Sequence, residues 1–142
     1  DMPVADSCGS LIKQIHDELE QQANNALRPV GLTMAQLGVV LALAGAEHGQ
    51  RSMKELERHL HVAQSTAAGI VSRLEQKGLV ESTGDPADRR IKRIRLTPAG
   101  YACWQEAEAN MQQAERLILS GLTETERDIF LVLLKKVRDS LQ

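Results

Sequence analysis

The chain has 142 residues, the size of one folded domain, and contains no run of the about 18 apolar residues that a membrane-spanning helix needs. Its net charge of −2 excludes a chain-wide attraction to polyanions, and its aromatic residues are too few to stack a single-stranded nucleic acid. Its two cysteines and four histidines lack the spacing of metal ligands, so we expect no metal ion and no cofactor.

The N-terminal third of the chain predicts two helices. Apolar residues recur at three- and four-residue spacings from about Ser10 to Leu27, and Pro29 ends this first helix. Thr33 and Gln36 have the spacing of a capping box, which opens the second helix. We expect the second helix to bury four apolar residues, Leu37, Val40, Leu41 and Ala44.

Two short helices follow, separated by a tight connection. Ser52 and Glu55 form another capping box that starts the third helix, and the fourth runs from about residue 64 to Gly78. Such a pair predicts a helix-turn-helix, whose second helix enters the DNA major groove with its N-terminal residues. No charged residue occurs at positions 62–72, which suits a surface pressed against DNA, although polar residues also favour helix starts without any partner. The predicted DNA contacts are Gln64, Ser65, Thr66, Ala68, Gly69 and Arg73.

The periodicity then changes from helical to extended. Residues 79–83 and 91–96 predict the two strands of a β-hairpin, joined by a stretch rich in turn formers. Residues 88–95 carry five cations and one anion, whereas residues 101–128 carry a net charge of −4. A cationic hairpin after a helix-turn-helix predicts a wing that enters the minor groove, although cations also protect solvated sheet edges. The predicted contacts of the wing are Asp88, Arg89, Arg90, Lys92 and Arg93.

Different roles are expected within the wing. Arg90 is the predicted groove-inserted side chain, because a narrow minor groove attracts arginine. Asp88 is expected to order the tip by accepting hydrogen bonds from backbone N–H groups or from a neighbouring arginine. Lys92, Arg93 and Arg95 are expected to contact phosphates or to form salt bridges.

Two further helices complete the chain. Thr97 and Pro98 start a long helix that ends near Leu119, and Thr123 caps the last one. The predicted fold is mainly α with a small β-hairpin wing, in the order α-α-α-α-β-β-α-α. We expect one domain over residues 1–142, in which 33–98 form the winged helix-turn-helix. Residues 7–30 and 99–142 are expected to be dimerisation helices, because one subunit cannot bury all their apolar stripes.

Residues 71–80 and 85–100 resemble the multiple-antibiotic-resistance regulator (MarR) family, at the end of its recognition helix and across its wing. The resemblance covers the whole chain in the order of elements. It implies a transcription regulator, usually a repressor, that binds a pseudo-palindromic double-stranded operator as a homodimer. It also implies that a small effector, often an aromatic compound, or an oxidant weakens DNA binding.

The sequence by itself leaves rival functions open. Cys8 lies near the position of a peroxide-sensing cysteine in some relatives of the family, but Tyr101 is the only tyrosine available to bond such a thiol. Cys103 is expected to be a packing residue. A winged helix that binds protein instead of DNA would not explain the cationic tip. No nucleophile with a base is apparent, so an enzyme is not expected, and the absence of a basic-then-apolar leader favours the cytoplasm.

Overall fold

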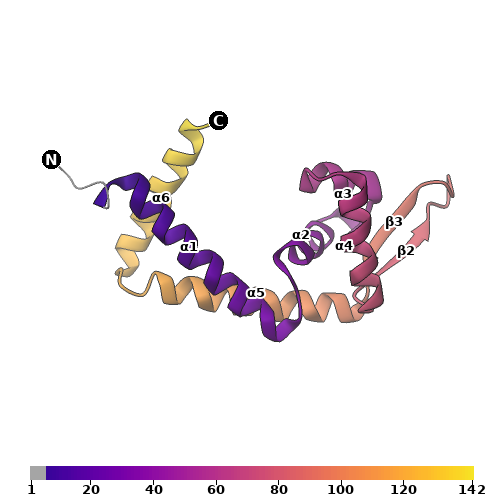
Figure 1. Cartoon of the computed structure of the whole chain (residues 1–142), viewed down its shortest axis with the longest axis horizontal. Coiled ribbons are helices and arrows are strands. Elements are labelled where there is room, and N and C mark those ends of the chain that lie inside the picture. Colours follow the sequence, from indigo (N-terminus) through magenta and orange to yellow (C-terminus); the bar gives the residue numbers. More distant parts are fainter. Residues whose placement is uncertain (1–5) are drawn as a thin grey trace.

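The computed structural model describes residues 6–142. Figure 1 shows an elongated molecule in which the long helix α5 runs between two ends, the wing at one and the start of α1 with α6 at the other. The elements are α1 (Cys8–Leu27), η2 (Arg28–Val30), α2 (Met34–Ala44), η3 (Glu47–Gly49), β1 (Gln50–Ser52), α3 (Met53–Leu60), α4 (Gln64–Gln76), β2 (Val80–Gly84), β3 (Lys92–Leu96), α5 (Pro98–Ile118) and α6 (Glu124–Ser140).

Local capping interactions set the helix starts. Thr33, Ser52 and Thr123 each close a capping box, in which the hydroxyl accepts the N–H three residues on and that residue's side chain bonds back. Helix α1 begins slightly earlier than predicted, at Cys8, because Ser7 caps it through the N–H of Ser10. These starts depend on neighbours along the chain, which is why the sequence predicts them well.

The sheet contains one strand that the sequence analysis missed. Its order is β1-β3-β2, antiparallel throughout, and β1 pairs residues Gln50 to Ser52 with Arg95 to Arg93. A three-residue strand is too short to display alternation, and its partner lies more than forty residues away. The wing is therefore the outer part of a three-stranded sheet, with β2 and β3 projecting from the winged domain (Figure 1).

The core lies in the winged domain, between α2, α3, α4 and the sheet. Its fully buried side chains include Leu43, Leu56, Leu74 and Ile94. The prediction that Leu41 is buried is wrong, since it is 49% exposed. Helix α2 is apolar around most of its circumference, so its periodicity could not select the inward face.

The other end of the molecule is much less covered. Helix α6 has no buried residue, and α1 buries only Ala23 and Leu27. The large side chains of the α1 stripe are exposed: Leu11, Ile12, Ile15 and Leu19. Within residues 6–142 no single helix is long and apolar enough to span a membrane, although Cys8–Val30 and Met34–Ala44, bent by 76°, reach that length and composition together.

Candidate nucleic-acid interface

The connection between α3 and α4 is a sharp turn made by His61. This residue adopts a left-handed conformation with φ 55° and ends α3 through hydrogen bonds from its N–H to Arg58 and Glu57. Helix α4 then starts at the N-cap Ala63, whose side chain offers no capping bond. The first N–H groups of α4 therefore have no side-chain cap, which suits the start of a helix that meets an anion.

Helix α4 divides cleanly into two faces. Ala67, Val71 and Leu74 are buried against the domain. The residues predicted to contact DNA all lie on the exposed side: Gln64, Ser65, Thr66, Ala68, Gly69 and Arg73. The structure thus brings the predicted set together on one accessible helix face, and its role toward DNA stays a prediction.

The start of α2 borders this exposed face. Thr33 and Gln36 line a hollow of about 340 Å³ together with Ser65, Gly69 and Arg73 of α4. The ammonium group of Lys77, just past the end of α4, bonds the Gly31 carbonyl and lies 2.8 Å from Oε1 of Gln36. Lys77 therefore ties the recognition helix to the entry of α2, a contact across more than forty residues that the sequence gives no means of predicting.

Asp88 and Arg90 form the tip of the wing as a closed pair. Oδ1 of Asp88 accepts hydrogen bonds from the backbone N–H of Arg90 at 3.1 Å and from its Nε at 3.0 Å, and Oδ2 accepts from Nη2 at 2.9 Å. These bonds confirm the expected local contact of Asp88. They also hold its pKa below the ordinary value, chiefly through the Arg90 side chain. The Arg90 side chain remains 90% exposed, available to a partner.

Asp85 organises the base of the wing, and the sequence analysis missed it because it was taken only as a turn former. It is buried, and its carboxylate accepts bonds from the N–H of Ala87 at 2.7 Å and of Asp88 at 3.4 Å. Nε of Arg93 donates to the other oxygen at 2.5 Å. This guanidinium is the main cause of a lowered pKa at Asp85. The spacing Asp-Pro-Ala-Asp is the available signal, since aspartate bonds the backbone two residues on.

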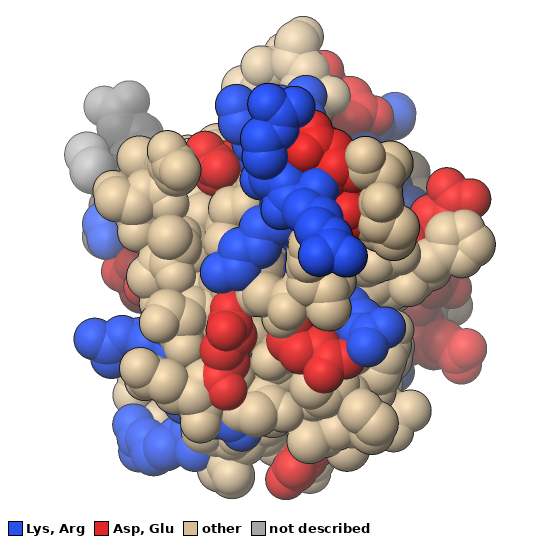
Figure 2. Space-filling model, turned by 90° about the vertical axis from the view of Figure 1, so that its right-hand side faces the viewer, with Lys and Arg blue, Asp and Glu red and all other residues tan. Residues whose placement is uncertain are grey.

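The remaining wing cations also have acidic neighbours. Arg93 and Arg95 pair with Asp85 and Glu81, and Lys92 lies 3.6 Å from Glu75 at the end of α4. For these three cations the sequence analysis predicted either phosphate contacts or salt bridges, and in the free protein they form salt bridges. Figure 2, which views the wing end, shows the Lys and Arg side chains as a band flanked by acidic ones.

The lowered pKa values of Asp85 and Asp88 give a pH-dependent wing. Both pKa values lie below the ordinary carboxyl pKa of about 3.9. The two ionised carboxylates therefore stabilise the tip fully at any pH above that ordinary value. We expect that stabilisation to be lost as the pH falls through the lowered values. Nitrogen-15 NMR of the arginine Nε–H groups measures this, and Arg90 and Arg93 should lose their ordered signals only in that acidic range.

Arg51 is the control for this titration. Its Nε donates to the backbone carbonyl of Ala42 at 2.8 Å, an acceptor that does not titrate. Its signal should therefore survive while the wing signals broaden. Loss of the wing signals already at pH 6, with Arg51 unchanged, would contradict this account of the tip.

An apolar cavity of about 420 Å³ lies between α1, α2 and α5. Leu41, exposed on α2, and Trp104 of α5 are among its walls. The indole N–H of Trp104 is buried without an acceptor among residues 6–142. Next to Trp104, Cys103 packs against the core, as expected, and burial raises the pKa of its thiol.

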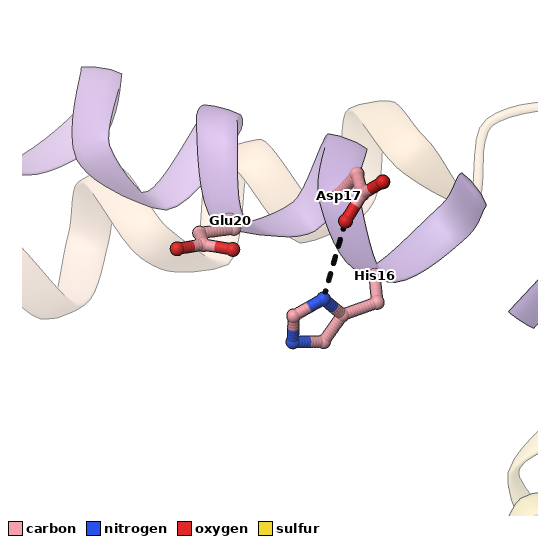
Figure 3. Close-up of side chains that lie close together, drawn as sticks. All are labelled: His16, Asp17 and Glu20. Atoms are coloured by element: carbon pink, nitrogen blue, oxygen red, sulfur yellow. Dashed lines mark ion pairs between the residues drawn. The ribbon is translucent and has the colours of Figure 1, made fainter. Parts of the chain in front are cut away.

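Three potential metal-ligand side chains lie close together on α1. Atoms of His16, Asp17 and Glu20 fall within 4.8 Å of one another, and Figure 3 shows the contact between His16 and Asp17. All three are exposed, and Asp17 also pairs with Lys13 at 2.9 Å. Exposed helical groups of this kind are ordinary solvated charges. They therefore give no reason to place a metal ion here.

Comparison with known proteins finds relatives along nearly the whole chain. A sequence model of the MarR family matches residues 30–91. NicR of Pseudomonas putida, named an HTH-type transcriptional repressor, is 35% identical over 140 residues, which is 96% of this chain and 85% of NicR. A mutant MarR from Escherichia coli complexed with operator DNA is 28% identical with a TM-score of 0.73, covering 91% of each chain. BpsR of Bordetella bronchiseptica, described with regulation of its DNA binding by 6-hydroxynicotinic acid, is 27% identical with a TM-score of 0.75 over 98% of each chain.

Proposed function

This chain belongs to the MarR family of transcription regulators, and we propose that it represses transcription as a homodimer that a small effector releases from its operator. Members of this family are transcription regulators and not, in general, enzymes. The observation that carries the proposal is the combination of an exposed α4 face, uncharged from residue 64 to 72, with an ordered cationic wing at the same end of the molecule (Figure 1).

The two DNA-reading elements have complementary chemistry. Helix α4 offers small and amide side chains that allow close approach to base edges in the major groove. The wing offers Arg90, whose exposed cationic side chain suits the negative potential of a narrow minor groove. We propose that Asp88 holds Arg90 ready in the free protein, and that Arg89, Lys92 and Arg73 contact the phosphates on either side.

A second copy of the chain is proposed to cover the apolar faces of α1 and α6. Helix α6 exposes about half of each of Ile129, Leu131, Val132, Leu133 and Leu134. The six consecutive apolar residues 129–134 cover every side of this part of the helix, and such a stretch is stable in water only when other elements surround it. Two copies related by a two-fold axis would place two α4 helices on successive half-sites of one operator. Because bacterial operators lie in the cytoplasm, we propose that the protein acts there.

The cavity between α1, α2 and α5 is the proposed effector site. Its volume of about 420 Å³ lies within the usual range for small-molecule sites, and its walls are mainly apolar. It adjoins Leu37, one residue from the Gln36 that Lys77 ties to the recognition helix. An occupant that shifts the start of α2 would therefore move the end of α4. This supports an apolar or aromatic effector.

Redox sensing through Cys8 is less well supported than effector binding. Cys8 is exposed at the start of α1, whereas Tyr101 packs against Gly49 at the winged end of the molecule. A tyrosine in that position cannot bond the Cys8 thiol within the same chain. Peroxide-induced release of DNA that disappears in Cys8→Ser would support the redox alternative instead.

The decisive experiment selects bound duplexes from a random pool with the purified full-length chain. We expect an inverted repeat with half-sites about one helical turn apart, and affinity that falls steeply with added salt. A recovered site without two-fold symmetry would contradict the homodimer. Failure to enrich any duplex would contradict DNA recognition itself.

Arg90→Ala tests the wing on the selected operator. We expect about tenfold weaker binding, because the groove-inserted arginine is lost, and a smaller dependence on salt. Arg138→Ala is the matched control, since Arg138 is also exposed and pairs with a neighbouring aspartate, at 3.0 Å, but lies on α6 at the opposite end (Figure 1). Because α6 is the proposed subunit interface, light scattering first verifies that both variants are dimers. Equal losses in both variants, measured by fluorescence anisotropy of labelled operator, would remove Arg90 from the interface.

A further inference from the structure

The cavity between α1, α2 and α5 contains charge of only one sign. Most of its lining is apolar, and its amide side chains are neutral. Among residues 6–142, Glu108 and Glu115 are its only charged lining residues, and no lysine or arginine lines it. The cavity is therefore an apolar space with an acidic wall.

The acidic wall follows from the register of α5. Trp104, Glu108 and Glu115 are spaced by four and seven residues, which places them on one face of the helix. The indole ring and the two carboxylates thus line the same cavity, together with Leu19 of α1 and Leu41 of α2. A bound molecule would contact apolar side chains on one side and this face on the other.

Neither carboxylate is neutralised within the described chain. Among residues 6–142 no ion pair or hydrogen bond joins the side chain of Glu108 or Glu115 to a cation, whereas four cations of the wing are paired. An anionic occupant would meet two uncompensated like charges beside an apolar wall, partly screened by water because both glutamate side chains are exposed. A cationic occupant would be attracted to both carboxylates and to the face of Trp104.

We propose that the cavity binds small apolar molecules that carry one positive charge, such as aromatic amines or quaternary ammonium compounds, and disfavours aromatic carboxylates. This ligand class rests on the proposed function, in which the cavity receives the effector. It differs in charge from the acid named for BpsR, because the lining of this cavity offers no cation to hold a carboxylate. The acidic face of α5 is thereby a specificity-determining surface.

Trp104 makes ligand binding measurable without DNA. It is the only tryptophan of the chain and it lines the cavity, so its fluorescence reports an occupant directly. The probes are phenyltrimethylammonium, its neutral isostere tert-butylbenzene, and benzoate, each titrated into the full-length protein. We expect phenyltrimethylammonium to bind about tenfold more tightly than benzoate, an order-of-magnitude value for two partly screened carboxylates. Equal or tighter binding of benzoate overturns the proposal.

Charge-neutral variants identify the residues responsible. Glu108→Gln with Glu115→Gln keeps the shape of the lining and should weaken phenyltrimethylammonium about tenfold while leaving tert-butylbenzene nearly unchanged. Glu106→Gln is the matched control, since Glu106 is an exposed glutamate of the same helix outside the cavity. A cation preference that survives in the double variant, or that Glu106→Gln removes equally, overturns the assignment.

Operator release separates this proposal from the proposed function. If phenyltrimethylammonium changes Trp104 fluorescence but leaves the operator complex intact, the ligand class stands and the regulatory role of the cavity fails. If benzoate alone releases the operator, the regulatory role stands and the cation proposal fails. If none of the three probes changes the fluorescence, the cavity is not a site for small apolar ligands and the cation proposal is overturned.

Discussion

Leu134→Asp is expected to convert the dimer to monomers and to lower operator affinity about a hundredfold or more, because linked recognition of two half-sites is lost. Leu134 is 47% exposed on α6, a helix without a buried residue in the single chain. A carboxylate in the middle of an apolar interface must be desolvated or must keep the two faces apart. Light scattering after size-exclusion chromatography measures the oligomeric state, and operator titration measures the affinity.

Lys135→Asp is the matched control for Leu134→Asp. It introduces the same side chain one residue away, at a position that is already charged and exposed. We expect it to leave the dimer intact. A Leu134→Asp protein that remains dimeric and binds the operator as tightly as the unchanged protein would show that the exposed apolar face of α6 is not the subunit interface.

Gly100→Ala is expected to lower the free energy of unfolding by about 2 kcal/mol, although alanine normally favours a helix. Gly100 lies in the first turn of α5, where an added Cβ would stand 2.1 Å from the carbonyl oxygen of Leu79 and 3.0 Å from Cδ2 of Leu96. The same carbonyl accepts the N–H of Thr97, so it cannot move away freely. Denaturant unfolding at constant protein concentration measures the change, because a dimer's stability depends on concentration.

Gly69→Ala is expected to raise the free energy of unfolding, the opposite of Gly100→Ala. Gly69 lies within α4 with no neighbouring atom within 4 Å of an added Cβ, so alanine should stabilise the protein by about 0.5–1 kcal/mol. If the exposed face of α4 meets DNA closely, the same change should weaken operator binding. Stabilisation of both variants would contradict the close approach inferred at Gly100.

Much of the fold was predictable because the signals are local. Capping boxes at Thr33, Ser52 and Thr123 mark helix starts through bonds that span three residues. The hairpin and its charge contrast are likewise visible along the chain, as is the contact between Asp88 and Arg90 two residues apart. The residues predicted on α4 lie on its exposed side because Ala67, Val71 and Leu74, at three- and four-residue spacings, turn the opposite side into the core.

Other features depend on contacts between distant segments. Strand β1 exists because β3 pairs with it, and Arg93 is paired with Asp85 because the folded hairpin brings the two side chains within 2.5 Å of each other. Leu41 is exposed because α2 is apolar on nearly every side, and only packing selects which side faces the core. None of these outcomes has a periodic or motif signal, since each is decided by a partner that sequence patterns do not identify.

The sequence alone therefore determined the order of helices, the recognition helix and the cationic wing, because turn chemistry and periodicity act between near neighbours. Only the tertiary structure decided which cations of the wing are held by Asp85, Glu81 and Glu75, and that the Arg90 side chain stays exposed. It also decided that α5 turns Trp104 and two carboxylates into one cavity. The physical reason is that burial and ion pairing depend on distances in space, which chain spacing fixes only within a single turn or hairpin.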